Sequence, residues 1–247
     1  MTDKVLVLIP AFNEEGAVAG VVREVRASMP DAAVLVVDDY SSDDTVPRAR
    51  EAGARVLTLP HHLGLGGCVQ AGYRLAFELG YDYVIRVDGD GQHDPRDIPK
   101  VLETLQREGC EMVIGSRFVP GLPSGHGDAQ ANEHSGSARA LGIVFFRAIL
   151  RPILGKPVHD PTSGFVGLNR TALALFSRSF PLEYPEIEAL VVLQRRRFRF
   201  VEVSCRFRPR RTGRSSITAI KSLYYMVHVL LGVFVNVLKF EGRKTKS

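Results

Sequence analysis

Short apolar runs alternate with amphipathic segments along the first half of the chain. Residues 4–9 and 33–37 are almost continuously apolar, as is typical of strands that are buried on both faces of a sheet. Between these runs, valines recur at the spacing of one helix face: Val18, Val21, Val22 and Val25. The chain is therefore predicted to begin with a strand, a helix and a second strand.

The same alternation continues through three further predicted strands: residues 55–59, 83–87 and 112–115. A short helix, capped by Ser41 or Ser42 and ending near Gly53, precedes the first of them. A helix over residues 67–79 precedes the second, and one marked by apolar residues between 98 and 105 precedes the third. Repeated units of this length predict an α/β fold in which helices cover a Rossmann-like, mostly parallel sheet.

The pattern becomes less regular after Phe118. Residues 119–137 are rich in Gly, Pro, Ser and His, which is typical of a functional lid or a disordered loop. Helical character returns over residues 139–154, and a late strand is predicted over residues 200–207. Residues 217–238 are strongly apolar and predict a C-terminal helix.

The overall composition is that of an ordinary globular protein, but its charge is unevenly spread. The formal net charge is +5, and residues 195–214 carry nine arginines and one glutamate. Further cations follow in residues 239–247. Such a concentration indicates an anionic partner, which could be nucleic acid, phosphate groups or a membrane surface, or else it forms a solvated basic face.

Cysteine use and the N-terminus bear on the compartment. Cys68, Cys110 and Cys205 are far apart and show no spacing typical of a zinc site, so we interpret them as apolar side chains in a reducing compartment. The first apolar run is short and begins almost at once, unlike a signal peptide. We therefore expect a cytoplasmic protein.

Asp88 and Asp90 follow the fourth predicted strand and are the most informative residues of the chain. Ligands gather at the carboxyl ends of parallel strands. Two carboxylates there suit a divalent cation that is also held by the phosphates of a nucleotide, and Gln92 and His93 add polar groups. An EF-hand is excluded because its sixth and twelfth positions would be His93 and Pro99. A role as a turn or cap remains an alternative.

A glycine-rich segment, residues 64–67, lies at the start of a predicted helix. It lacks the third glycine of a dinucleotide-binding fingerprint, because Val69 stands there. A helix start near a phosphate or a sugar remains an alternative for this segment.

Motifs occur along the chain in one order: VLIPAFNEE, VVDDYSSDDT, HHLGLGGCVQAGY, VDGDGQHDP, GSRF, DPTSGFVGLNR and RRTGRS. Together they resemble glycosyltransferase family 2, and most closely its dolichol- and polyprenyl-phosphate mannosyl- and glucosyltransferases, over roughly residues 4–217. The resemblance implies a GT-A fold. It also implies transfer of a hexose from a nucleotide-diphosphate sugar, UDP- or GDP-linked, to a lipid phosphate with inversion at the anomeric carbon.

The resemblance implies roles at the donor site. The nucleoside pocket should be lined by Pro10, Ala11, Asn13 and Glu15. Asp39 should receive the base, whose ring N–H groups donate to a carboxylate. A cation, Mg²⁺ or Mn²⁺, should bridge the donor phosphates and be held by Asp88, Asp90 and Gln92. Arg210 is expected to clamp the diphosphate, although Ser216 replaces a lysine of some relatives and arginines 208, 211 and 214 are alternatives.

On the acceptor side, Arg117 and Arg139 match positions that should bind the acceptor phosphate. Asp160 matches an aspartate assigned as a catalytic base or a sugar-orienting group, and it joins Asp90 and Arg117 in the predicted catalytic set. We favour orientation, because a phosphate acceptor is already ionised at neutral pH. Two glutamates are expected to bind the sugar or to begin a solvated helix: Glu186 and Glu188.

The chain is predicted to divide into a catalytic domain, residues 1–216, and a C-terminal helix with a basic tail, residues 217–247. The apolar part of that helix, residues 223–238, is shorter than the roughly 20 residues that span a bilayer. We favour a helix at the membrane interface, with a role in a homo-oligomer. The alternatives are docking to a multi-pass membrane partner, a marginal span, or packing on the catalytic domain.

The predicted function is metal-dependent transfer of a hexose to polyprenyl phosphate, peripherally on the cytoplasmic face of a membrane. Two alternatives remain. One is a family 2 enzyme that acts on a soluble or saccharide acceptor, and the other is a non-catalytic protein that binds a nucleotide sugar or RNA. We expect no nucleic-acid partner, because the arginine cluster lacks stacking aromatics in the pattern of a known RNA-binding module.

Overall fold

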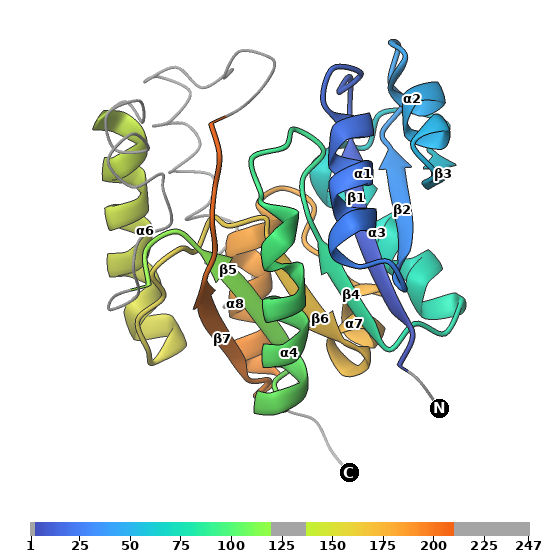
Figure 1. Cartoon of the computed structure of the whole chain (residues 1–247). Coiled ribbons are helices and arrows are strands. Elements are labelled where there is room, and N and C mark those ends of the chain that lie inside the picture. The colour runs from blue at the N-terminus through green and yellow to red at the C-terminus, as the bar shows by residue number, and fades with distance from the viewer. Residues whose placement is uncertain (1–2, 120–136, 210–247) are drawn as a thin grey trace.

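A sheet of seven strands lies at the centre of the computed structural model, which describes residues 3–119 and 137–209 (Figure 1). The strands are β1 (Val5–Ala11), β2 (Ala33–Asp38), β3 (Arg55–Thr58), β4 (Tyr83–Arg86), β5 (Met112–Ser116), β6 (Val166–Asn169) and β7 (Phe200–Ser204). Their order across the sheet is β3-β2-β1-β4-β6-β5-β7. This arrangement confirms the predicted α/β class.

Helices cover both faces of the sheet (Figure 1). They are α1 (Val18–Ser28), α2 (Thr45–Glu51), α3 (Gly64–Glu78), α4 (Ile98–Glu108), α6 (Ser137–Leu154), α7 (Arg170–Phe176) and α8 (Pro185–Arg195), with a 3₁₀ turn, η1 (Pro95–Asp97), before α4. Side chains alternate between the faces along β1, so that Leu6 and Leu8 pack with α3, α7 and α8. Val7 and Ile9 pack with α1 and α4 on the other face. Each face of the sheet therefore has its own core.

One strand runs against the others. β1 pairs in parallel with β2 and β4, β2 with β3, and β5 with β7, whereas β6 is antiparallel to both β4 and β5. Neither β6 nor α7 was predicted, α8 was considered only as a helix start at Glu186 and Glu188, and the predicted late strand over residues 200–207 is too long. β7 ends at Ser204, and Phe207 forms an isolated antiparallel bridge with His93.

The carboxyl ends of β1, β2 and β4 meet at one edge of the sheet. Ala11 is aligned with Asp38, and Leu8 is aligned with Arg86. Because β6 is antiparallel to β4, the segment that leads into β6 reaches the same edge, where Val166 is aligned with Arg86. The loops that carry most of the predicted site residues are thereby brought together.

Two glycines of α3, Gly66 at its start and Gly72 in its middle, have a packing explanation. A Cβ atom on Gly66 would lie 2.3 Å from the carbonyl oxygen of Leu182, and one on Gly72 would lie 2.5 Å from Cδ1 of Leu8. Real Cβ atoms do not approach other heavy atoms so closely. Gly66 thus lets the start of α3 contact the backbone just before α8, and this contact accounts for the glycine without a bound phosphate.

Several predictions fall outside the described residues. These are the segment after Phe118 for most of its length, Arg210, and the C-terminal helix and tail over residues 217–247. Within residues 3–119 and 137–209, none of the helices has both the length and the apolar character needed to cross a bilayer.

We expect Gly66→Ala to lower the free energy of unfolding by about 1–3 kcal/mol, because the added methyl group meets backbone rather than a movable side chain. Urea unfolding of the purified protein measures the change. Arg74→Ala, on an exposed position of the same helix, is the control and should shift stability by about 0.5 kcal/mol or less. Equal unfolding midpoints for the two variants would contradict the packing explanation.

Candidate active site

The loops after β1 and β2 are bound to each other by side chains. The Asn13 backbone N–H donates to Ser41 Oγ at 2.9 Å, and the Ser42 N–H donates to Asn13 Oδ1 at 2.9 Å. The Asp44 N–H donates to Glu15 Oε2 at 3.2 Å. Asn13 adopts a left-handed conformation with φ of 53°, which an asparagine tolerates better than most residues. Asn13 and Glu15 therefore shape the surface on which the predicted nucleoside pocket would lie.

Asp39 is buried beside this surface and is held by the start of α3. Its Oδ1 accepts the Leu63 N–H at 2.7 Å, and its Oδ2 lies 2.9 Å from His62 Nδ1. The ring of Phe12 lies 4.3 Å from the His62 ring and is 45% exposed. Pro10 and Ala11, the other predicted pocket residues, are buried at the end of β1. Phe12 was not among the predicted site residues, although an aromatic residue directly after a buried strand was a visible signal.

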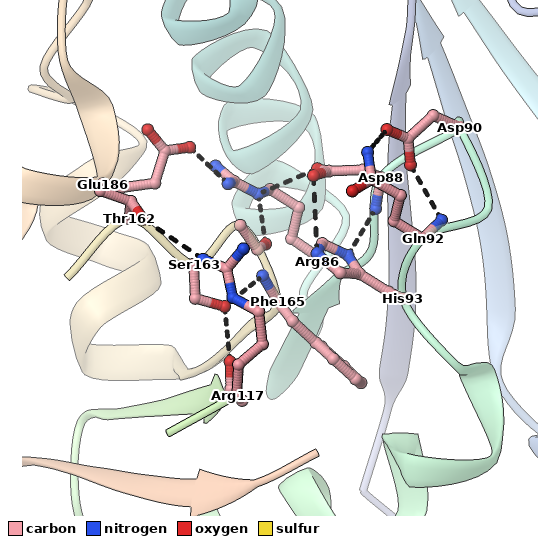
Figure 2. Close-up of polar contacts among 12 residues, drawn as sticks. Arg86, Asp88, Asp90, Gln92, His93, Arg117, Thr162, Ser163, Phe165 and Glu186 are labelled. Carbon is pink, nitrogen blue, oxygen red and sulfur yellow. Dashed lines mark hydrogen bonds and ion pairs between the residues drawn. The ribbon is translucent and has the colours of Figure 1, made fainter. Parts of the chain in front are cut away.

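The loop after β4 presents Asp88 and Asp90. Asp90 is held by Gln92, whose backbone N–H donates to Oδ1 at 3.0 Å and whose side-chain amide donates to Oδ2. The Asp88 side chain is 34% exposed. Gln92 was predicted as a metal ligand. In the structure its side-chain amide nitrogen donates to Asp90 and so orients that carboxylate (Figure 2).

His93 supports Asp88 from below. Its Nδ1 accepts the Asp88 backbone N–H at 3.0 Å, so the neutral ring carries its proton on Nε2, which lies 3.6 Å from Asp88 Oδ2. The ring packs between Phe165, stacked at 5.2 Å, and Phe207, edge-on at 5.1 Å. Burial lowers the pKa of His93 from 6.5 to about 3, so the ring is neutral at physiological pH.

Arg86 lies at the end of β4 with its side chain only 2% exposed. Its Nε donates to the Gly164 carbonyl at 2.7 Å and its Nη2 donates to Glu186 Oε1 at 2.6 Å, while Asp88 Oδ1 lies 3.9 Å from Nε (Figure 2). Burial lowers the pKa of Arg86, but the charges of Glu186 and Asp88 outweigh it and raise the pKa above its ordinary value. Arg86 was not among the predicted site residues, although a lone charge within an apolar strand was a visible signal.

The two glutamates of α8 are not solvated, so that alternative was wrong. The Glu186 side chain is 14% exposed and is paired with Arg86, and Glu188 is buried. Glu186 reaches Arg86 from the opposite side to Asp88 (Figure 2). The first turn of α8 therefore faces the same cluster as the loop after β4.

Asp160 and Arg117 form a second buried ion pair. Arg117 donates to Asp160 through Nε at 2.8 Å and through Nη2 at 2.7 Å, and its backbone N–H adds a bond of 3.0 Å. The Asp160 side chain is fully buried, and its backbone N–H donates to Glu202 Oε1 at 2.8 Å. Both carboxylate oxygens of Asp160 are thus occupied by one guanidinium. Arg139 lies in α6, but its side chain is outside the part of the chain that the structure describes, as is Arg210.

The carboxylates that follow β4 suit a divalent cation of the magnesium or manganese type. Asp88 and Asp90 offer carboxylate oxygens from a single loop. Within residues 3–119 and 137–209, no three side chains of the His, Cys, Asp or Glu types are grouped so as to hold a metal ion. Magnesium and manganese are commonly held by one or two carboxylates together with the phosphates of a substrate. The residues therefore fit a cation that arrives with a diphosphate, and they do not fit a cage made of protein ligands alone.

Comparison with known proteins identifies the family. The profile of glycosyl transferase family 2 matches residues 6–176. The chain belongs to this family. The resemblance inferred from the ordered motifs is thereby confirmed.

Three relatives illustrate the range of the family around this chain. Undecaprenyl-phosphate mannosyltransferase of Micrococcus luteus is 38% identical over 48% of this chain and 50% of its own length. UDP-N-acetylglucosamine–dolichyl-phosphate N-acetylglucosaminyltransferase of Methanococcus voltae is 30% identical over 82% of this chain and 85% of its own. Polyprenol monophosphomannose synthase of Mycolicibacterium smegmatis is 30% identical over 70% and 64%. The match thus spans only half of the first relative.

Solved structures share the fold. Glucosyl-3-phosphoglycerate synthase from Mycobacterium tuberculosis, in complex with phosphoglyceric acid, has a TM-score of 0.72 at 23% identity over 95% of this chain and 80% of its own. A complex of that enzyme with Mn²⁺, UDP and phosphoglyceric acid has a TM-score of 0.71 at 23% identity over 94% and 78%. At this identity the likeness establishes a shared fold.

We expect His93 to make the metal-free protein less stable as the pH is lowered. The folded state resists protonation of this ring until about pH 3, whereas the unfolded chain takes up the proton near pH 6.5, so acid favours the unfolded chain between those values. The contribution of the neutral His93 ring to the free energy of unfolding is complete above pH 6.5 and is lost as the pH falls. Between pH 7 and pH 5 it should change by about 1–2 kcal/mol.

Urea unfolding of wild type and His93→Gln in EDTA, at pH 7, 6 and 5, measures this change. Glutamine keeps an acceptor for the Asp88 N–H but does not titrate, and all other ionisable groups are common to both proteins. The difference in unfolding free energy should therefore shrink as the pH falls. A difference that stays constant from pH 7 to pH 5 would show that the buried His93 ring is not the source of the lost stability.

Proposed function

We propose that this chain transfers a hexose from a nucleoside-diphosphate sugar to the phosphate of a polyprenyl phosphate, with inversion at the anomeric carbon. The observation that carries the donor side is the pair Asp88 and Asp90 at the carboxyl end of β4, in a chain of glycosyl transferase family 2. The acceptor is supported by the names of the three relatives. Two of the names specify mannose and one specifies N-acetylglucosamine, but each names a polyprenyl or dolichyl phosphate or a polyprenol product.

The donor would lie along the edge formed by β1, β2 and β4. The exposed ring of Phe12 offers a flat surface for the base. His62 contacts both this ring and Asp39, so that Asp39 lies near the same surface. Asp88 and Asp90 would face the diphosphate together with Mg²⁺ or Mn²⁺. When bound, this cation supplies Lewis-acid stabilisation of the charge that develops on the departing diphosphate. Arg210 is proposed as a further diphosphate ligand.

The chain's own residues would position the acceptor for in-line attack. An oxygen of the acceptor phosphate forms the new bond to the anomeric carbon, and the bond from that carbon to the donor diphosphate breaks, with its electron pair left on the diphosphate oxygen. Because the attacking oxygen is already ionised, no side chain has to remove a proton. Arg117 and Arg139 are proposed to bind the acceptor phosphate.

Asp160 would then act on Arg117 and not on the acceptor. Its two oxygens accept from Nε and Nη2 of one guanidinium, which fixes the plane of that group. The stacking of Arg117 against the rings of Phe118 at 5.3 Å and Phe207 at 5.1 Å limits its movement further. This geometry supports an orienting role for Asp160 over a role as a base.

We further propose that residues 1–216 form the catalytic domain and that residues 217–247 bring it to the membrane surface on which a polyprenyl phosphate is held. The basic residues of the tail would attract anionic headgroups, at about 1 kcal/mol for each cation near the surface. A soluble phosphate ester is the competing acceptor, because the structural neighbours include a complex with phosphoglyceric acid. Both acceptors present a phosphate, so the test must distinguish lipid from soluble sources.

The proposal is tested by transfer of radiolabelled sugar. The full chain is incubated with UDP- and GDP-hexoses and Mn²⁺, with either undecaprenyl phosphate in detergent or 3-phosphoglycerate. We expect label in the organic phase only when polyprenyl phosphate and Mn²⁺ are both present. Asp90→Asn should reduce the rate by about 100-fold or more, because charge stabilisation of the leaving group is lost.

Asp31→Asn is the matched control, since Asp31 is exposed between α1 and β2 at the other edge of the sheet, and its rate should equal that of wild type. Label found only in a water-soluble product would overturn the lipid acceptor. No transfer from any donor to either acceptor would overturn the proposed reaction.

Asp160→Asn distinguishes orientation from base catalysis. If Asp160 orients Arg117, the variant should raise the KM for polyprenyl phosphate by about 10-fold and lower kcat less, because the guanidinium loses its bidentate partner. Thr162→Val removes two long contacts, one of 3.3 Å from the same Arg117 nitrogen and one of 3.5 Å to Asp160 Oδ1, but it keeps the bidentate ion pair and should change KM little. Circular dichroism verifies folding. A fall in kcat of about 1000-fold with unchanged KM would instead indicate a base.

A further inference from the structure

Arg86 is an unusual residue to find inside a sheet. It is the largest of the fully buried side chains among the described residues. Removing a guanidinium from water costs several kcal/mol, and a buried ion pair recovers that cost only with very good geometry. A pair of apolar side chains would join β4 to α8 equally well or better. The presence of a charge here therefore calls for a reason beyond packing.

The geometry of β4 supplies that reason. Side chains alternate along a strand, so residues two apart point to the same face. Arg86 is the last residue of β4, and Asp88, two positions further on, lies on the same side, with Arg86 Nε 3.9 Å from Asp88 Oδ1. On its other side, Nη2 donates to Glu186 at 2.6 Å. One buried cation is thus shared between a carboxylate of the proposed metal site and a carboxylate of α8 (Figure 2).

Gly164 closes the cluster from a third direction. Its carbonyl accepts from Arg86 Nε at 2.7 Å. A Cβ atom on Gly164 would lie 2.5 Å from Arg86 Nη2 and 2.8 and 3.0 Å from the two carboxylate oxygens of Asp88. The bare Cα thus permits the guanidinium and the carboxylate to be adjacent, and it leaves the Asp88 carboxylate little room to rotate inward.

We propose that Arg86 is a positioning residue that holds the Asp88 carboxylate in one orientation for a metal–diphosphate ligand, and that Glu186 holds Arg86 in that place. This inference rests on the proposed function, since it concerns the same site. Arg86 is too deeply buried to touch the substrate. It acts through Asp88, as outer groups that orient metal ligands do.

A purely structural role for Arg86 makes a different prediction. In Arg86→Met, Glu186 remains buried without its partner, so the protein loses stability for reasons unrelated to Asp88. The double variant Arg86→Met/Glu186→Gln removes both charges and should recover most of the lost stability. If Arg86 only joins β4 to α8, cation binding should recover with it. If Arg86 positions Asp88, cation binding should stay weak.

The experiment measures binding of Mn²⁺ in the presence of UDP or GDP, without turnover, from the electron paramagnetic resonance signal of free Mn²⁺. Thermal unfolding is recorded for the same samples. We expect the double variant to unfold close to the wild-type temperature and yet to bind Mn²⁺ with nucleotide about 10-fold or more weakly. Arg86→Lys keeps a cation near Asp88 and should bind more tightly than the double variant.

Two controls separate charge and stability. Arg74→Met removes an arginine from an exposed ion pair with Glu78 on α3. Leu173→Ala opens a cavity where α7 packs into the hydrophobic core. Both should bind Mn²⁺ with nucleotide as wild type does, the second despite its lower stability.

Two results would count against us, and they differ. A stable double variant with wild-type affinity for Mn²⁺ and nucleotide overturns the positioning role and leaves Arg86 as a link between β4 and α8. Wild-type protein that binds neither UDP nor GDP with Mn²⁺ overturns the proposed function and the inference with it.

Discussion

The burial of one positive charge at the end of β4 constrains much of the surrounding structure. The Arg86 guanidinium can stay away from water only while acceptors surround it, and these come from three parts of the chain: Asp88, Gly164 and Glu186. The loop after β4, the segment before β6 and the start of α8 must therefore keep fixed positions relative to one another. The antiparallel β6 serves the same end, because its direction brings Gly164 to the edge where β4 ends.

The DPTSGF segment, residues 160–165, joins this cluster to the second buried ion pair. Asp160 accepts from Arg117 after β5, and the Ser163 hydroxyl donates to the Gly115 carbonyl within β5. Gly164 contacts Arg86 and Asp88, and Phe165 stacks on His93. Successive residues thus bind the ends of β5 and β4 in turn. The need to satisfy these contacts explains the motif as a structural connection between the proposed donor and acceptor sides, even before any substrate is considered.

The fold could be predicted largely from the sequence because its first five strands are short, apolar and separated by amphipathic helices. The antiparallel β6 could not, since four residues of VGLN carry no periodicity and their direction is set by pairing on both sides. Asp88 and Asp90 were found because both stand together after a buried strand. The ion pairs Arg86–Glu186 and Arg117–Asp160 were not predicted, because their partners are 100 and 43 positions apart in the sequence. Such pairings depend on the tertiary fold and leave no local pattern.

The charges at this edge also bear on how a diphosphate would approach it. Asp88, Asp90 and Glu186 carry negative charge, and Arg86, which lies 3.9 Å from Asp88, is buried and partly neutralised by Glu186. A diphosphate that came near the two aspartates alone would meet like charge, which costs more as water is excluded. A divalent cation between them reverses the sign of that interaction. Because two carboxylates of one loop leave most of the coordination positions open, the phosphates would complete them, so the affinities for cation and nucleotide would rise together.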